Sequence, residues 1–132
     1  MTAIFADLDL AITGYLRDAL AAREEACAAD VQVSVKVPNP RLDRMVIVRR
    51  DGGRRTGPVL ETARIGVQVW GATFEECSAL CALVRALLTA MPDGDPVCAV
   101  EEVLAPSPVD DPSGQPLRFG TYLLTARGAD FT

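Results

Sequence analysis

The chain has 132 residues, a net charge of −5 and 49% hydrophobic side chains, so its length and composition predict one domain over residues 1–132. Only 5% of the residues are aromatic, which predicts an aliphatic core. The absence of histidine excludes His-dependent catalysis and removes the commonest zinc ligand. No apolar run reaches the ~18 residues of a membrane span, so no membrane partner is expected.

The first half of the chain predicts one helix and two strands. Apolar residues recur at helical spacing from Ala6 to about Ala22. The alternation in VQVSVKV (31–37) predicts a strand with one apolar face, ended by Pro38. The β-branched run in RMVIVRR (44–50) predicts the next strand.

The middle of the chain predicts a loop, a strand and a second helix. Three glycines in DGGRRTGP predict a flexible loop that projects at about 50–61. In the strand ARIGVQVWGA (63–72), alternation turns Ile65 to one face and Trp70 to the other. A helix follows over 72–91, with Thr73 as its N-cap.

Two strands end the predicted order of elements. They are VCAVEEVLA (97–105) and LRFGTYLLTARG (117–128), and four prolines between them predict an irregular loop at about 105–116. The order α-β-β-β-α-β-β predicts an α+β fold. We expect a mainly antiparallel sheet of about five strands with two helices packed on one face.

The candidate catalytic groups do not form a pattern that supports an enzyme. Cys77 and Cys81 share a helix face, where free cysteines usually pack as small apolar residues. Half a metal site or a redox pair is the alternative. The carboxylates at 101–102 are neighbours on a predicted strand and therefore point to opposite faces. Those at 110–111 lie in a proline-rich loop, where Asp is a common turn residue. No phosphate-binding loop or nucleophile elbow is present. We therefore expect no enzymatic activity, no metal and no cofactor.

Positive charge is concentrated in one part of this acidic chain. Residues 36–64 contain eight basic and three acidic side chains, a net charge of +5, which leaves −10 for the remainder. Such a division favours contact with an acidic partner surface, although a solvated hairpin tip would give the same pattern. Nucleic-acid binding is a third interpretation, but the segment has no aromatic residue on which bases could stack. The predicted interaction residues are Arg49, Arg50, Arg54, Arg55, Arg64 and Trp70.

Three segments, in order, resemble the tail terminator (tail completion, neck-type) proteins of long-tailed actinobacteriophages. The segments are VSVKVPNPRLDRMVIVRRDGG (33–53), ARIGVQVWGATFEECSALCALVRALL (63–88) and VDDPSGQPLRFGTYLLTARG (109–128). The resemblance implies a structural virion protein that forms a ring of six copies at the tail–neck junction. Such a ring ends polymerisation of the tail tube and joins the tail to the head connector.

The same resemblance implies the partners and the location of the protein. Its partners are further copies of itself, the major tail tube protein and the head–tail connector or neck proteins, and DNA only passes through the lumen of the ring. Assembly is expected in the host cytoplasm. A head-completion or stopper protein of the neck is the nearest alternative, and a small nucleic-acid-binding protein is the more distant one.

Overall fold

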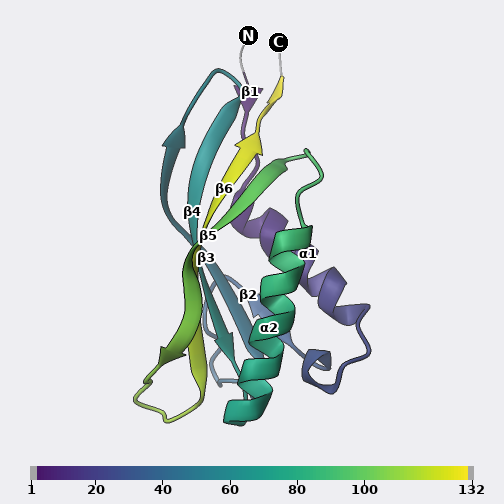
Figure 1. Ribbon diagram of the computed structural model, residues 1–132, viewed down its shortest axis with the longest axis vertical. Helices are drawn as coiled ribbons and strands as arrows, with labels where there is room; N and C mark the ends of the chain where they lie inside the picture. The colour runs from purple at the N-terminus through teal and green to yellow at the C-terminus, as the bar shows by residue number, and fades with distance from the viewer. Residues whose placement is uncertain (1–2, 131–132) are drawn as a thin grey trace.

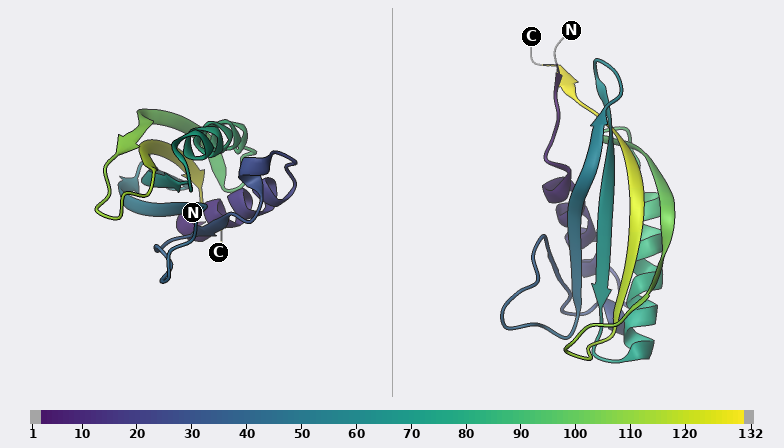
Figure 2. Two further views of the ribbon diagram at one scale, coloured as in Figure 1. Left: turned by 90° about the horizontal axis from the view of Figure 1, so that it is seen from below. Right: turned by 90° about the vertical axis from the view of Figure 1, so that its left-hand side faces the viewer.

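The computed structural model describes residues 3–130 and has an α+β fold, with a long twisted five-stranded sheet and two helices on one of its faces (Figures 1 and 2). The expected fold class is confirmed. The elements in chain order are β1 (Ala3–Ile4), α1 (Leu8–Ala21), the 3-10 turn η1 (Ala26–Ala28), β2 (Gln32–Ser34), β3 (Met45–Arg55), β4 (Leu60–Trp70), α2 (Phe74–Ala90), β5 (Val97–Val109), β6 (Leu117–Arg127) and β7 (Ala129–Asp130).

The sheet is mixed, with the strand order β2-β3-β4-β6-β5. The pairs β3–β4, β4–β6 and β5–β6 are antiparallel, whereas the short β2 runs parallel to β3. A separate two-stranded pairing of β1 with β7 brings the two ends of the described chain together (Figure 1). Neither helix within residues 3–130 is long and apolar enough to cross a membrane.

Both helices begin at side-chain caps. The Oδ1 atom of Asp7 accepts a hydrogen bond from the Leu10 amide at 3.3 Å at the start of α1. The Oγ1 atom of Thr73 accepts one from the Glu76 amide at 3.1 Å at the start of α2, as the sequence predicts. Each cap satisfies one of the amides that lack a partner in the first turn of a helix.

Two apolar cores lie on opposite faces of the sheet. The larger core packs both helices against the sheet, and Leu16, Ile65 and Leu80 are among its buried members. The smaller core on the other face consists of Met45, Ile47, Trp70 and Leu117. Ile65 and Trp70 therefore point to opposite faces, as the alternation in the sequence predicts.

The segment expected as a projecting loop is a β-hairpin instead. Strand β3 continues to Arg55 and β4 begins at Leu60, so only Thr56–Val59 form the turn. The two neighbouring glycines belong to a bulged part of β3 rather than to a turn. At Gly53, φ is +127° and a Cβ atom would lie 2.2 Å from the Thr62 carbonyl oxygen, so glycine is required there.

Two further differences from the sequence-based expectation lie at the edges of the sheet. Strand β5 includes Pro106 and Pro108, which leaves an irregular loop of only 110–116. An edge strand tolerates proline because its outer side has no partner for an amide. At the other edge β2 ends at Ser34, where the hydroxyl donates a hydrogen bond of 2.6 Å to the Lys36 carbonyl and the chain bends.

Candidate protein-interaction surface

The outer part of the β3–β4 hairpin, residues 49–64, extends to one end of the molecule and is called the arm below (Figure 1). All residues of β3 from Arg49 to Arg55 are exposed, whereas those from Met45 to Val48 are buried. Antiparallel pairing with β4 continues to the pair Arg55–Glu61, so backbone pairing between the two strands holds the arm in place. Its arginine side chains therefore project from an ordered strand.

Arg50 is the arginine of the arm that is held by contacts within its own chain. Its Nη2 atom lies 2.7 Å from Oε1 of Glu61, a carboxylate only 6% exposed. Its Nε atom donates to the Gly52 carbonyl at 3.1 Å, and its amide donates to Oδ1 of Asp9 at 2.9 Å. Arg50 thus neutralises a buried carboxylate. Moving Arg50 to another partner would leave that carboxylate unpaired and would be energetically costly.

Two further arginines of the arm make weak surface contacts. The Nε atom of Arg64 lies 3.5 Å from Oδ1 of Asp51, and both side chains are about half exposed. The guanidinium of Arg55 lies 4.9 Å from the centre of the Phe5 ring. An exposed ion pair contributes about 0–1 kcal/mol, so a partner carboxylate can replace such contacts.

Arg49 and Arg54 have no ion-pair partner within residues 3–130. Arg49 borders a pocket of about 250 Å³ on the helix-free face of the sheet. In that pocket the Phe119 ring lies so close to Gly66 that a Cβ atom there would be 3.1 Å from it. Arg49 and Arg54 are therefore the charges that the arm offers most freely.

Trp70 does not share a surface with the arginines of the arm. It lies at the other end of β4, is 3% exposed and belongs to the smaller core. The guanidinium of Arg41 covers its ring at 4.9 Å, and its Nε1 atom donates to Oε1 of Gln68 at 3.4 Å. In the isolated chain Trp70 therefore packs a core, and its expected contact with a partner stays a prediction.

A groove that the sequence did not indicate lies between η1 and the first half of α2. Its volume is about 550 Å³. Its lining residues are Glu25, Ala26, Cys27, Arg44, Glu75, Glu76, Ala79 and Leu83. A signal that could have indicated it is the spread of apolar residues in α2 around more than one side of the helix.

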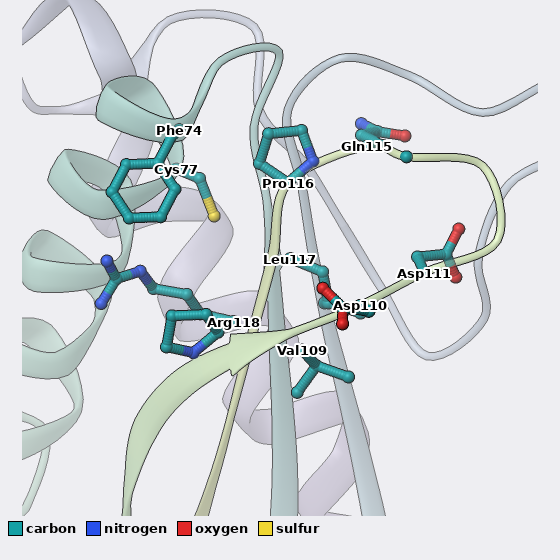
Figure 3. A pocket seen from close by; sticks show the side chains of 11 residues that line it. Phe74, Cys77, Val109, Asp110, Asp111, Gln115, Pro116, Leu117 and Arg118 are labelled. Carbon is teal, nitrogen blue, oxygen red and sulfur yellow. The ribbon is translucent and has the colours of Figure 1, made fainter.

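A second hollow lies where α2 begins beside the β5–β6 hairpin (Figure 3). It has a volume of about 240 Å³ and is bordered by Phe74, Val109 and Arg118. Phe74 is 58% exposed, and the Arg118 guanidinium lies 5.3 Å from the centre of its ring. An exposed aromatic ring beside a cation is typical of contact surfaces between proteins.

The thiols of α2 lie in the protein interior. Cys77 and Cys81 are buried, and the Cys77 thiol donates to the Val69 carbonyl at 3.2 Å. Burial raises the pKa of Cys81 to about 11, so this thiol is neutral at physiological pH. Within the described part of the chain, no three His, Cys, Asp or Glu side chains are arranged so that they could hold a metal ion together.

The fold has relatives among solved structures. No protein-family model matches the sequence, and neither does any curated protein. Eleven chains of solved structures match the fold. One belongs to the virion of a native gene transfer agent (GTA) particle, with a TM-score of 0.63 and 14% sequence identity over 88% of this chain and 94% of that chain. At this identity the likeness shows a shared fold.

Proposed function

We propose that the protein is a structural component of a phage-like virion, and that its copies form a ring at the head-proximal end of a tail tube. There the ring would end tube polymerisation and join the tail to the head connector. The observation that carries the proposal is the fold shared, over nearly the full length of both chains, with a chain of a GTA virion. The order of the three sequence segments that resemble tail terminator proteins supports the more specific role.

The surface of the chain supports a role in assembly. Six identical subunits in a closed ring need two different patches that complement each other. The arm presents Arg49 and Arg54, which have no ion-pair partner among residues 3–130, while the chain outside residues 36–64 has a net charge of −10. Opposite charge on two parts of one subunit favours a head-to-tail contact between copies.

The proposed role of the arm is to dock on an acidic surface of a neighbouring subunit or of the tail tube protein. One exposed ion pair contributes about 0–1 kcal/mol, so several arginines must act together. Arginine suits this role because its planar guanidinium binds a carboxylate through two parallel hydrogen bonds. Arg50 is excluded from the docking set because Glu61 already holds it.

The test of this function is a charge reversal of the arm in a particle-producing strain. The variant R49E/R54E/R55E should fold and melt like the wild type, because these side chains are exposed and make no buried ion pair. Its particles should have overlong tubes or heads without tails. The matched control, R49K/R54K/R55K, keeps the charges and should assemble tails of normal length. Normal, head-joined tails in the Glu variant would mean that the arginines form only a solvated tip.

The same strain separates the two alternatives. Loss of a head-completion or stopper protein should leave tube length normal and affect the heads, whereas loss of a tail terminator lengthens the tubes. A nucleic-acid-binding protein would bind duplex DNA with an affinity that falls steeply with salt. We expect weak binding in a filter assay at physiological salt, because the overall charge is −5. Tight binding there would favour the nucleic-acid alternative.

A further inference from the structure

The groove between η1 and α2 has an apolar floor and an acidic rim. Ala26, Cys27, Ala79 and Leu83 form the floor. Three carboxylates and one guanidinium stand around it, so the lining residues have a net charge of −2; these four are Glu25, Glu75, Glu76 and Arg44. A ligand that fits such a groove combines a small apolar surface with two positive charges.

The carboxylates of the rim differ in how far they are already neutralised. Glu76 pairs with Arg44 across the groove. Among residues 3–130, Glu25 forms an ion pair with Arg23 alone. Both side chains are more than 40% exposed, so this contact is weak. Glu75 is exposed and has no ion-pair partner within residues 3–130. Glu25 and Glu75 can therefore accept cations from outside.

The tip of the arm has the complementary chemistry. Residues 54–60 read RRTGPVL, with two exposed arginines followed by a short apolar turn that includes Pro58 and Val59. The turn is ordered, because the Thr56 and Gly57 amides donate to the Leu60 carbonyl at 2.9 and 3.2 Å. An ordered tip loses less conformational entropy on docking than a flexible loop would.

The tip and the groove lie at opposite ends of the elongated molecule (Figure 1). The arm ends beside β1 and β7, whereas the groove is formed where α2 begins and η1 packs against it (Figure 1). One copy therefore cannot place its tip in its own groove. A second copy can, and such a contact joins two different patches, which generates a ring if the rotation closes and a filament if it does not.

We propose that the arm tip of one copy docks in the groove between η1 and α2 of the next copy. The two arginines of the tip pair with Glu25 and Glu75, and the Pro58–Val59 turn covers the apolar floor around Cys27. The closure of this contact into a ring rests on the proposed function. The head-to-tail contact itself does not, because it is argued from the charge and the apolar character of the two patches.

The groove contains a native probe for this contact, because Cys27 is half-buried in its floor. The variant T56C places a second thiol on the exposed tip. In a C98S background, which removes the other half-buried thiol, a short bismaleimide should couple residue 56 of one copy to Cys27 of the next. The product on a denaturing gel should be a ladder of covalent multimers.

Two controls make the crosslink specific. Replacing Cys27 by Ser should remove the ladder, and S107C, an exposed thiol on β5 in place of T56C, should give none. Charge reversal of the tip (R54E/R55E) or of the rim (E25R/E75R) should each lower the yield at least tenfold. Combining the two reversals should restore it, because the ion pairs form again with their signs exchanged.

The crosslink is measured both with concentrated purified protein and in assembled particles. A ladder that needs Cys27 in either sample, with recovery in the combined reversal, supports the proposal. No ladder in either sample, or a ladder that persists in C27S, overturns it. If T56C links only to a different protein in the particles, the tip binds that partner and the proposed self-contact is wrong. If electron microscopy shows a ring of this protein in the particles but no Cys27-dependent crosslink forms, the proposed function stands and only this contact is refuted.

Discussion

The two halves of strand β3 share one backbone ladder and have opposite surroundings. Met45–Val48 are at most 2% exposed and contribute side chains to both cores, whereas Arg49–Arg55 are all exposed. Both halves pair with β4 in the same antiparallel register apart from one bulge. The difference shows that the inner half stabilises the fold through buried area, while the outer half is held by its backbone and leaves most of its side chains for a partner.

The largest expected effect tests the inner half. The substitution Ile47→Ala removes a side chain that is 2% exposed in the smaller core, and it should lower the free energy of unfolding by about 2–5 kcal/mol. Arg54→Ala, in the outer half of the same strand, should change it by no more than about 0.5 kcal/mol. Urea denaturation of both variants measures the two free energies of unfolding. Equal losses would mean that the inner and outer halves of β3 do not differ in their contribution to stability.

Arg50 is the expected exception in the outer half. Arg50→Gln leaves the carboxylate of Glu61, 6% exposed, without its cation, and should cost about 1–3 kcal/mol. The double variant R50Q/E61Q should recover part of this loss, because it also removes the buried charge. If R50Q melts like the wild type, the Arg50–Glu61 pair does not anchor the arm.

High pH should destabilise the helix-covered core. The ordinary thiol pKa is 9.0, and burial raises that of Cys81 to about 11, so between these values the unfolded chain has released a proton that the folded chain retains. The contribution of Cys81 to the free energy of unfolding is therefore fully present below pH 9 and is lost as the pH rises towards 11. Denaturation midpoints from pH 8 to 11 under reducing conditions should fall less steeply in C81A. An identical slope in C81A would contradict this assignment.

Of the two ion pairs within the arm, the exposed pair of Arg64 and Asp51 should contribute less to stability. Arg64→Gln removes a contact of 3.5 Å to Asp51 between two half-exposed side chains, and should cost less than about 1 kcal/mol. Addition of 0.5 M salt should abolish even that difference, because screening acts strongly on exposed charges. A larger cost that persists in salt would show that Arg64, like Arg50, belongs to the fold.

Local sequence patterns predicted most of the secondary structure. Helical spacing and the Thr73 cap located α2, and alternation located the central strands and the opposite faces of Ile65 and Trp70. The errors arose where tertiary pairing overrides composition. Gly52 and Gly53 predict a turn, but both pair with β4 directly after the bulge in β3. Pro106 predicts an irregular loop, but it lies in an edge strand.

The candidate surface was predictable only in part. The concentration of arginines in the sequence located the arm, and the structure places Arg49 and Arg54 there without ion-pair partners within residues 3–130. The sequence could not show that Arg50 is held by Glu61 or that Arg41 covers Trp70, because these contacts depend on strand register and on the path of a loop. The groove at η1 also arises only when the helices pack.

The most direct test of the proposed role is electron cryo-microscopy of tail-bearing particles from a strain that produces this protein. We expect a ring of copies at the junction between the tail tube and the neck, with the arm of each copy in contact with an acidic surface. Density for the protein at the baseplate, along the tube or on the capsid shell would contradict the account.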